Sequence, residues 1–191
     1  MHRGRLEAFS DGVVAILITI MVLELKVPRG ITAEALGPLL PVVSSYVLSF
    51  VFLGIYWNNH HHMLHMVDRV NGKILWANLH LLFWLSLVPF VTAYLGQNGA
   101  SPLPTALYGA VLLLAAIAYT ILQSTIITAQ GPVSKLREAV SGDVKGKVSI
   151  ACYAAGIALA DVAPWVSIAL YVAVAATWLV PDRRIERRIG S

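Results

Sequence analysis

Long apolar blocks alternate with short polar stretches along the whole chain. Most of these blocks have about the 17 to 25 residues that one membrane-spanning helix requires. Six blocks can be marked, at about residues 9–25, 36–59, 74–95, 104–128, 148–159 and 164–180. No block repeats another, so the chain is expected to form one domain, residues 1–191. The pattern therefore predicts an all-α membrane protein with six transmembrane helices.

Two prolines are expected to end or bend a predicted helix. Pro28, followed by an arginine and a glycine, marks a stop after the first block. Pro89 lies inside the third block. A proline removes one backbone donor, and a spanning helix tolerates it when neighbouring groups satisfy the freed carbonyl. We therefore expect a kink near Pro89.

Composition supports a membrane protein and limits its chemistry. Only 13% of the 191 residues are charged, against about 25% in a typical soluble domain. The mean hydropathy is +0.73. A single cysteine, Cys152, excludes a disulfide within the chain. Nothing in the sequence is typical of a nucleophile–base pair, a phosphate loop or paired carboxylates, so neither an enzyme nor a bound cofactor is expected.

The basic residues predict the orientation in the membrane. With six spans, all but Lys26 and Arg29 fall on one side, and cytoplasmic loops are the ones enriched in lysine and arginine. Both termini are therefore predicted to be cytoplasmic. The net charge of +4 is interpreted as this topology signal and as contact with lipid headgroups, not as a nucleic-acid site. The residues on the cytoplasmic side would be Arg3, Arg5, Arg69, Lys73, Lys135, Arg137, Lys145, Lys147, Arg183, Arg184, Arg187 and Arg188.

The first predicted helix has two different faces. Successive residues on a helix are about 100° apart. Measured from Ile16, one face comprises Phe9, Gly12, Ile16, Thr19, Ile20 and Leu23, all within about 60°. Asp11 and Ser10 lie about 140° and 120° away from Ile16. The aspartate therefore need not share the environment of the apolar stripe.

An unpaired aspartate inside a membrane costs a few kcal/mol, so Asp11 needs a partner. His60 and Asn78 are predicted at the same depth, and Trp57 has an indole N–H to place. We hypothesise a buried polar clasp of Asp11, Ser10, His60 and Asn78 that fixes the first helix, with Arg5 near the headgroups. Alternatively, Asp11 caps the helix or reaches the interface.

The same residues carry a resemblance to a known family. Arg5-x-x-x-Phe9-Ser10-Asp11 resembles the signature of the transmembrane protein 175 family of potassium channels, as do Trp57-x-x-His60 and Asn78 with Pro89-Phe90. The resemblance covers the first three predicted spans by motif and the rest by hydropathy alone. It implies a prokaryotic plasma-membrane protein of one six-span unit, assembled as a homotetramer around the first helix. No TVGYG filter loop is present.

The resemblance also implies how potassium would pass. Ile16, Ile20 and Leu23 would form an apolar constriction, and Thr19 would add a layer of hydroxyl groups. This agrees with the physics of pores, because a hydrophobic constriction can gate by dewetting. Periodicity alone favours a face toward lipid or toward the protein core over a pore wall.

Several alternatives stay open. Asp11 and His60 could form the relay of a proton channel or a proton-coupled transporter, and the chain could instead be a non-conducting scaffold. His61 and His65 share a helix face, but no carboxylate or cysteine is expected to complete a metal set, so no metal site is predicted. The histidines could also sense pH. Glu24 could attract cations at the outer mouth or pair with Lys26 or Arg29.

Overall fold

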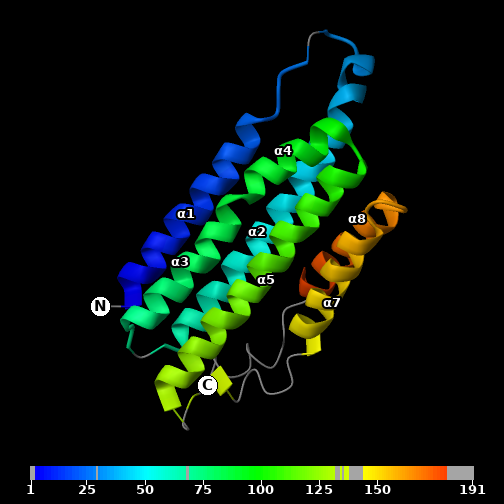
Figure 1. Ribbon diagram of the computed structural model, residues 1–191. Coiled ribbons are helices and arrows are strands. Elements are labelled where there is room, and N and C mark those ends of the chain that lie inside the picture. The colour runs from blue at the N-terminus through cyan, green and yellow to red at the C-terminus, as the bar shows by residue number, and fades with distance from the viewer. Residues whose placement is uncertain are drawn as a thin grey trace.

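The described residues fold into helices that pack side by side, as Figure 1 shows. The computed structural model describes residues 3–28, 30–67, 69–131, 134, 136–137 and 144–179, and these contain no β-strand. The helices are α1 (Arg3–Leu23), the 3-10 helix η1 (Ala33–Leu39), α2 (Leu40–His65), α3 (Gly72–Ser86), α4 (Val88–Asn98), α5 (Pro102–Gln130), α7 (Val144–Leu159) and α8 (Pro164–Leu179).

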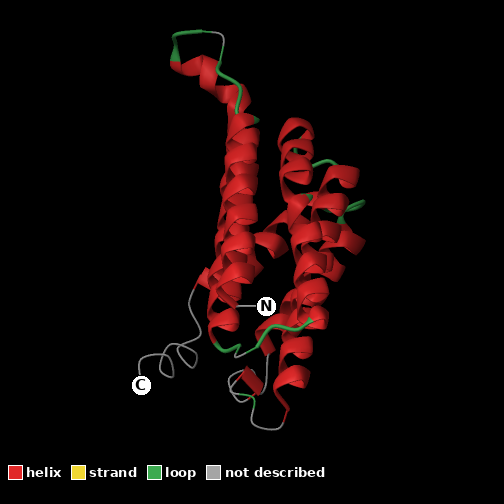
Figure 2. Ribbon diagram, turned by 90° about the vertical axis from the view of Figure 1, so that its left-hand side faces the viewer, coloured by secondary structure: helices red, strands yellow, loops and turns green. Residues whose placement is uncertain are grey.

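The helix α1 lies at one edge of the bundle. It packs against α2, α3 and α4, while α7 and α8 pack on α5 at the opposite edge (Figure 1). The view from the side shows the long helices running roughly along one common axis (Figure 2). The described helices of the chain therefore leave one flank of α1 uncovered.

The third predicted block is divided at the expected place. The helix α3 ends at Ser86 and α4 begins at Val88, with Pro89 in its first turn. Pro89 cannot donate to the carbonyl group of Leu85, and its ring would collide with that group. The backbone N–H of Leu87 turns back to the carbonyl oxygens of Trp84 and Leu85 instead. The predicted kink is confirmed, and it lies two residues before the proline.

The observed helices extend beyond the apolar blocks at several ends. Within the described ranges, four helical segments are long and apolar enough to cross a membrane: 3–23, 33–65, 72–98 and 102–130. The helix α8 is apolar but shorter, and α7 has 16 residues. Six spans therefore remain a prediction. Of the basic residues that predict orientation, Arg29, Lys135, Arg183, Arg184, Arg187 and Arg188 lie outside the described residues.

Buried tyrosines hold the later helices together. Tyr171 of α8 lies so close to α5 and α7 that a Cβ atom at Gly109 would meet its hydroxyl oxygen at 2.0 Å, and one at Gly156 would meet its ring at 2.4 Å. Only glycine fits at these two contacts. The hydroxyl group of Tyr108, on α5, is 2.8 Å from that of Ser49 on α2. These contacts join α5 to α7 and α8 on one side and to α2 on the other.

Candidate functional site on the first helix

The helix α1 has one face packed into the chain and one face open. Its buried residues recur every three to four positions, as a helix with one packed stripe requires. They are Leu6, Ser10, Val14, Leu17 and Met21. Because α1 contacts α2, α3 and α4 through this stripe, its position is set by the helices around it.

The open face carries the residues that the sequence singled out. Ile16 is 58% exposed and Leu23 is 76% exposed, with Ile20 and Phe9 also open to the outside. Thr19 is exposed between them, and its hydroxyl group donates a hydrogen bond to the carbonyl oxygen of Ala15 at 2.9 Å. The donor of Thr19 is thus used within the helix, while its oxygen lone pairs face outward. The open face is an apolar stripe with one hydroxyl acceptor.

A chain of buried hydrogen bonds anchors the packed face of α1. The side chain of Asn78, on α3, is fully buried and donates to the hydroxyl oxygen of Ser10 at 3.0 Å. The amide oxygen of Asn78 is 2.7 Å from Nε2 of His60 on α2. Ser10 in turn donates to the carbonyl oxygen of Leu6 at 2.9 Å. Three of the four residues in the hypothesised clasp therefore meet in one network that joins three helices.

Asp11 lies outside this series of buried hydrogen bonds. Its carboxylate accepts a hydrogen bond from the indole N–H of Trp57 at 2.9 Å. Among the described contacts it makes no hydrogen bond with His60 or Asn78, which differs from the clasp as hypothesised. The reason is geometric, because Ser10 points into the contact with α3 whereas the next residue points toward α2.

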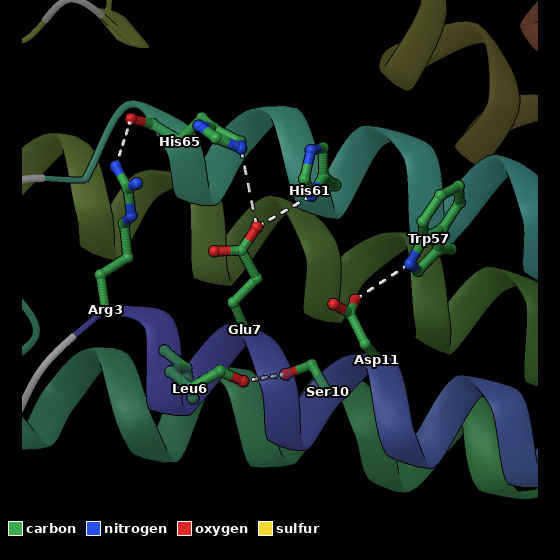
Figure 3. A network of polar contacts seen from close by, with 8 residues as sticks. All are labelled: Arg3, Leu6, Glu7, Ser10, Asp11, Trp57, His61 and His65. Carbon is green, nitrogen blue, oxygen red and sulfur yellow. Dashed lines mark hydrogen bonds and ion pairs between the residues drawn. The ribbon is translucent and has the colours of Figure 1, made fainter.

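Asp11 belongs instead to a polar seam between α1 and α2 (Figure 3). The two helices run in opposite directions, so partners advance by four residues on α1 and retreat by four on α2. Nη1 of Arg3 donates to the carbonyl oxygen of His65 at 2.9 Å. Oε1 of Glu7 is 2.8 Å from Nδ1 of His61 and 3.7 Å from Nε2 of His65. We call Arg3, Glu7, Asp11, Trp57, His61 and His65 the α1–α2 seam.

Two of these residues were not predicted from the sequence. Glu7 stands beside His61 and His65, so the expectation that no carboxylate would join the two histidines is wrong. Arg3 was interpreted only as a topology signal. The spacing of Arg3, Glu7 and Asp11 at four-residue intervals was a usable signal, because it puts all three on one side of a helix.

The remaining predicted residues lie apart from these networks. Arg5 and Phe9 are exposed on α1. Glu24 is exposed in the turn that follows α1. Of its two proposed basic partners, Arg29 lies outside the described residues. The site therefore consists of an open apolar stripe on α1 and of two polar networks on the other side of this helix. These networks are the buried hydrogen bonds of Ser10, Asn78 and His60, and the α1–α2 seam.

The chain is similar to known proteins over most of its length. A family model described as endosomal/lysosomal potassium channel TMEM175 matches residues 5–89, from the arginine of the motif to Pro89. A potassium channel of Chryseobacterium sp. (strain P1-3) is 53% identical over 189 residues, which are 99% of this chain and 98% of the relative. A potassium channel of Streptomyces collinus is 41% identical over 124 residues, covering 61% of this chain and 60% of the relative.

A solved structure has the same fold. The crystal structure of a lysosomal potassium-selective channel TMEM175 homolog from Chamaesiphon minutus superposes with a TM-score of 0.79 at 28% identity. The match covers 93% of this chain and 96% of the other. The motifs in the sequence covered only the first three predicted spans, so this match extends the similarity to the later helices.

Proposed function

Because this chain belongs to the TMEM175 family of potassium channels, we propose that it conducts potassium passively through a pore lined by α1. The observation that carries the proposal is the open face of α1. It is apolar, bears one threonine, and lies on the helix with the RxxxFSD motif. The relatives of this chain are named as potassium channels and not as enzymes, in agreement with the expectation from the sequence.

A single copy of α1 cannot enclose a pore, so the proposal requires several copies of the chain. We propose a homotetramer in which four open faces converge on one axis. The exposed side chains of Phe9, Ile16, Ile20 and Leu23, which the described helices of one chain leave open, would then face that axis. The other exposed faces would contact lipid.

Within this pore, Ile16, Ile20 and Leu23 would form rings of aliphatic side chains. A narrow aliphatic ring resists wetting and so blocks hydrated ions until it widens. Thr19 would place four hydroxyl oxygens beside the constriction. Oxygen atoms that replace water around a cation favour its passage, and the bond from Thr19 to Ala15 leaves the lone pairs available.

The polar contacts on the other side of α1 would hold this wall in place. The Ser10–Asn78–His60 chain fixes the rotation of α1 about its own axis, because Ser10 must face α3. The pair of Asp11 and Trp57 ties the next residue to α2. We therefore propose that the signature residues Ser10, Asp11, Trp57, His60 and Asn78 support the pore structurally, whereas Arg5 and Phe9 are exposed and take no part in the described networks.

A proton relay through Asp11 and His60 is less well supported. Asp11 is bonded to Trp57, and His60 to Asn78, whose amide does not readily exchange protons. The described hydrogen bonds therefore give no path from the aspartate to the histidine.

For the whole chain we propose a multi-pass location in a prokaryotic plasma membrane, with both termini cytoplasmic and no cofactor apart from the permeant K⁺.

Ion flux from purified protein in liposomes tests the proposed function. Potassium, sodium and proton gradients are imposed separately, and liposomes without protein are the control. We expect K⁺ to move down its own gradient without a proton gradient. If protons move and K⁺ does not, the channel is a proton pathway. If nothing moves, the chain is a scaffold, and the proposal fails in both cases.

A further inference from the structure

Three metal-ligating side chains converge at one end of the α1–α2 seam. They are Glu7 of α1 and His61 and His65 of α2, and their candidate ligand atoms all lie within 4.8 Å of one another. Figure 3 shows both imidazole rings directed toward the carboxylate from the same side. Each ring presents a nitrogen to the same oxygen, Oε1, at 2.8 Å for His61 and 3.7 Å for His65.

The helices hold these groups in place. His61 and His65 are four residues apart on α2, so they project from the same face one turn apart. Their ring centroids are 4.4 Å apart. Arg3, one turn before Glu7, donates to the carbonyl oxygen of His65 and so pins the end of α2 to the start of α1. The cluster is therefore set by the packing of two helices and not by a loop.

An ion pair alone does not account well for two imidazole rings beside one carboxylate. For the carboxylate to form an ion pair with both imidazole rings at once, both rings would have to carry a positive charge at 4.4 Å centroid separation. Two like charges so close repel each other. Neutral imidazole rings each have one nitrogen with a free lone pair. A metal ion can accept lone pairs from both rings and from the carboxylate at once, without that repulsion.

We propose that Glu7, His61 and His65 bind a divalent transition-metal ion of the zinc class. Two imidazole nitrogens and one carboxylate oxygen form a three-ligand set that leaves a fourth tetrahedral position for water. Imidazole favours zinc and its neighbours over calcium or magnesium, which take oxygen ligands. The histidine side chains are 36% and 42% exposed, so an ion can enter from outside. The bound ion would join α1 to α2.

This inference does not depend on the proposed function, because metal binding by the purified chain is measured without any ion flux. The full chain carries a histidine-free tag and is titrated with Zn²⁺ against a competing chelating dye. The variants are Glu7→Gln, His61→Gln and His65→Gln. The matched control is His80→Gln, since His80 is an exposed histidine of α3 that bonds to Trp84 away from the seam.

We expect one zinc ion per chain in the unmodified protein and in the His80 variant. Loss of a residue that only orients a ligand costs about 10-fold to 100-fold in metal affinity. Removing a ligand itself should therefore weaken zinc binding at least about tenfold in each of the three variants. Zinc should also raise the thermal unfolding midpoint of the unmodified chain and of the His80 variant, but not that of the other three.

Two results would overturn the proposal. One is the absence of stoichiometric zinc binding in the unmodified chain. The other is equal affinity in the unmodified chain and in the variants of Glu7, His61 and His65. A single variant that fails to fold leaves the other two to decide, because each removes a different ligand of the same site.

Discussion

Replacing Ile16 with asparagine should raise ion flux through the assembled protein at least about tenfold. Ile16 is 58% exposed on the open face of α1, and in a tetramer four copies would face one another. Four amide groups would hold water where four butyl chains exclude it, which lowers the barrier to a hydrated ion. A barrier lower by only ~1.4 kcal/mol raises a rate about tenfold.

The matched control is Ile121→Asn. Ile121 is also exposed, at 43%, but it lies on α5, which packs against α3, α4, α7 and α8. Both variants are reconstituted at equal protein density, and K⁺ and Na⁺ efflux are followed separately. We expect the Ile16 variant to leak both ions and to discriminate less between them. Equal flux in the two variants would mean that another helix forms the wall.

Replacing Asn78 with alanine should destabilise the protein by about 1–3 kcal/mol. The change removes the partner of His60 Nε2 and the donor to Ser10, and it leaves both groups buried. Hydrogen bonds between helices in membrane proteins average about 0.6 kcal/mol and reach about 1.7 kcal/mol, so the two lost bonds account for this range. The midpoint of unfolding in detergent measures the loss.

A double-mutant cycle separates this network from general packing. Ser10→Ala, Asn78→Ala and the pair are compared, and residues in one network lose less together than the sum of their single losses. Asn59→Ala is the control, because the described hydrogen bond of the Asn59 side chain goes to the carbonyl oxygen of Ile55 within its own helix, α2. Strictly additive losses at Ser10 and Asn78, or an equal loss at Asn59, would contradict a coupled anchor.

The two faces of α1 were predictable because they follow from local geometry. Helical spacing placed Ile16, Ile20 and Leu23 together, and all three are exposed. The kink near Pro89 followed from the missing backbone donor. The family was predicted from the RxxxFSD motif and is confirmed by the matching family model and relatives. Each of these inferences needs only residues that lie near one another in the sequence.

The partners across helices were not predictable in the same way. Spacing showed that Asp11 points away from the open face, but the partner depends on how α2 is rotated and shifted along α1. The observed register puts Trp57, and not His60, opposite Asp11. The same register brings Glu7 to His61 and His65. Such contacts join residues about fifty positions apart, and helical periodicity contains no information on that register.

Silver ions test most directly whether the open face of α1 is the ion path. Ag⁺ is a monovalent cation that can follow K⁺ and bonds irreversibly to a thiolate, so it blocks a pore lined by cysteine. The native Cys152 is first replaced with alanine, and Thr19→Cys is compared with Thr120→Cys. Thr120 is a matched control, because it is an exposed threonine of α5 whose hydroxyl group also donates to a carbonyl oxygen four residues earlier.

The account predicts that Ag⁺ abolishes K⁺ flux through the Thr19→Cys channel and leaves the Thr120→Cys channel conducting. Flux through the Thr19→Cys channel that persists in Ag⁺, or equal block of both channels, would contradict a pore lined by α1.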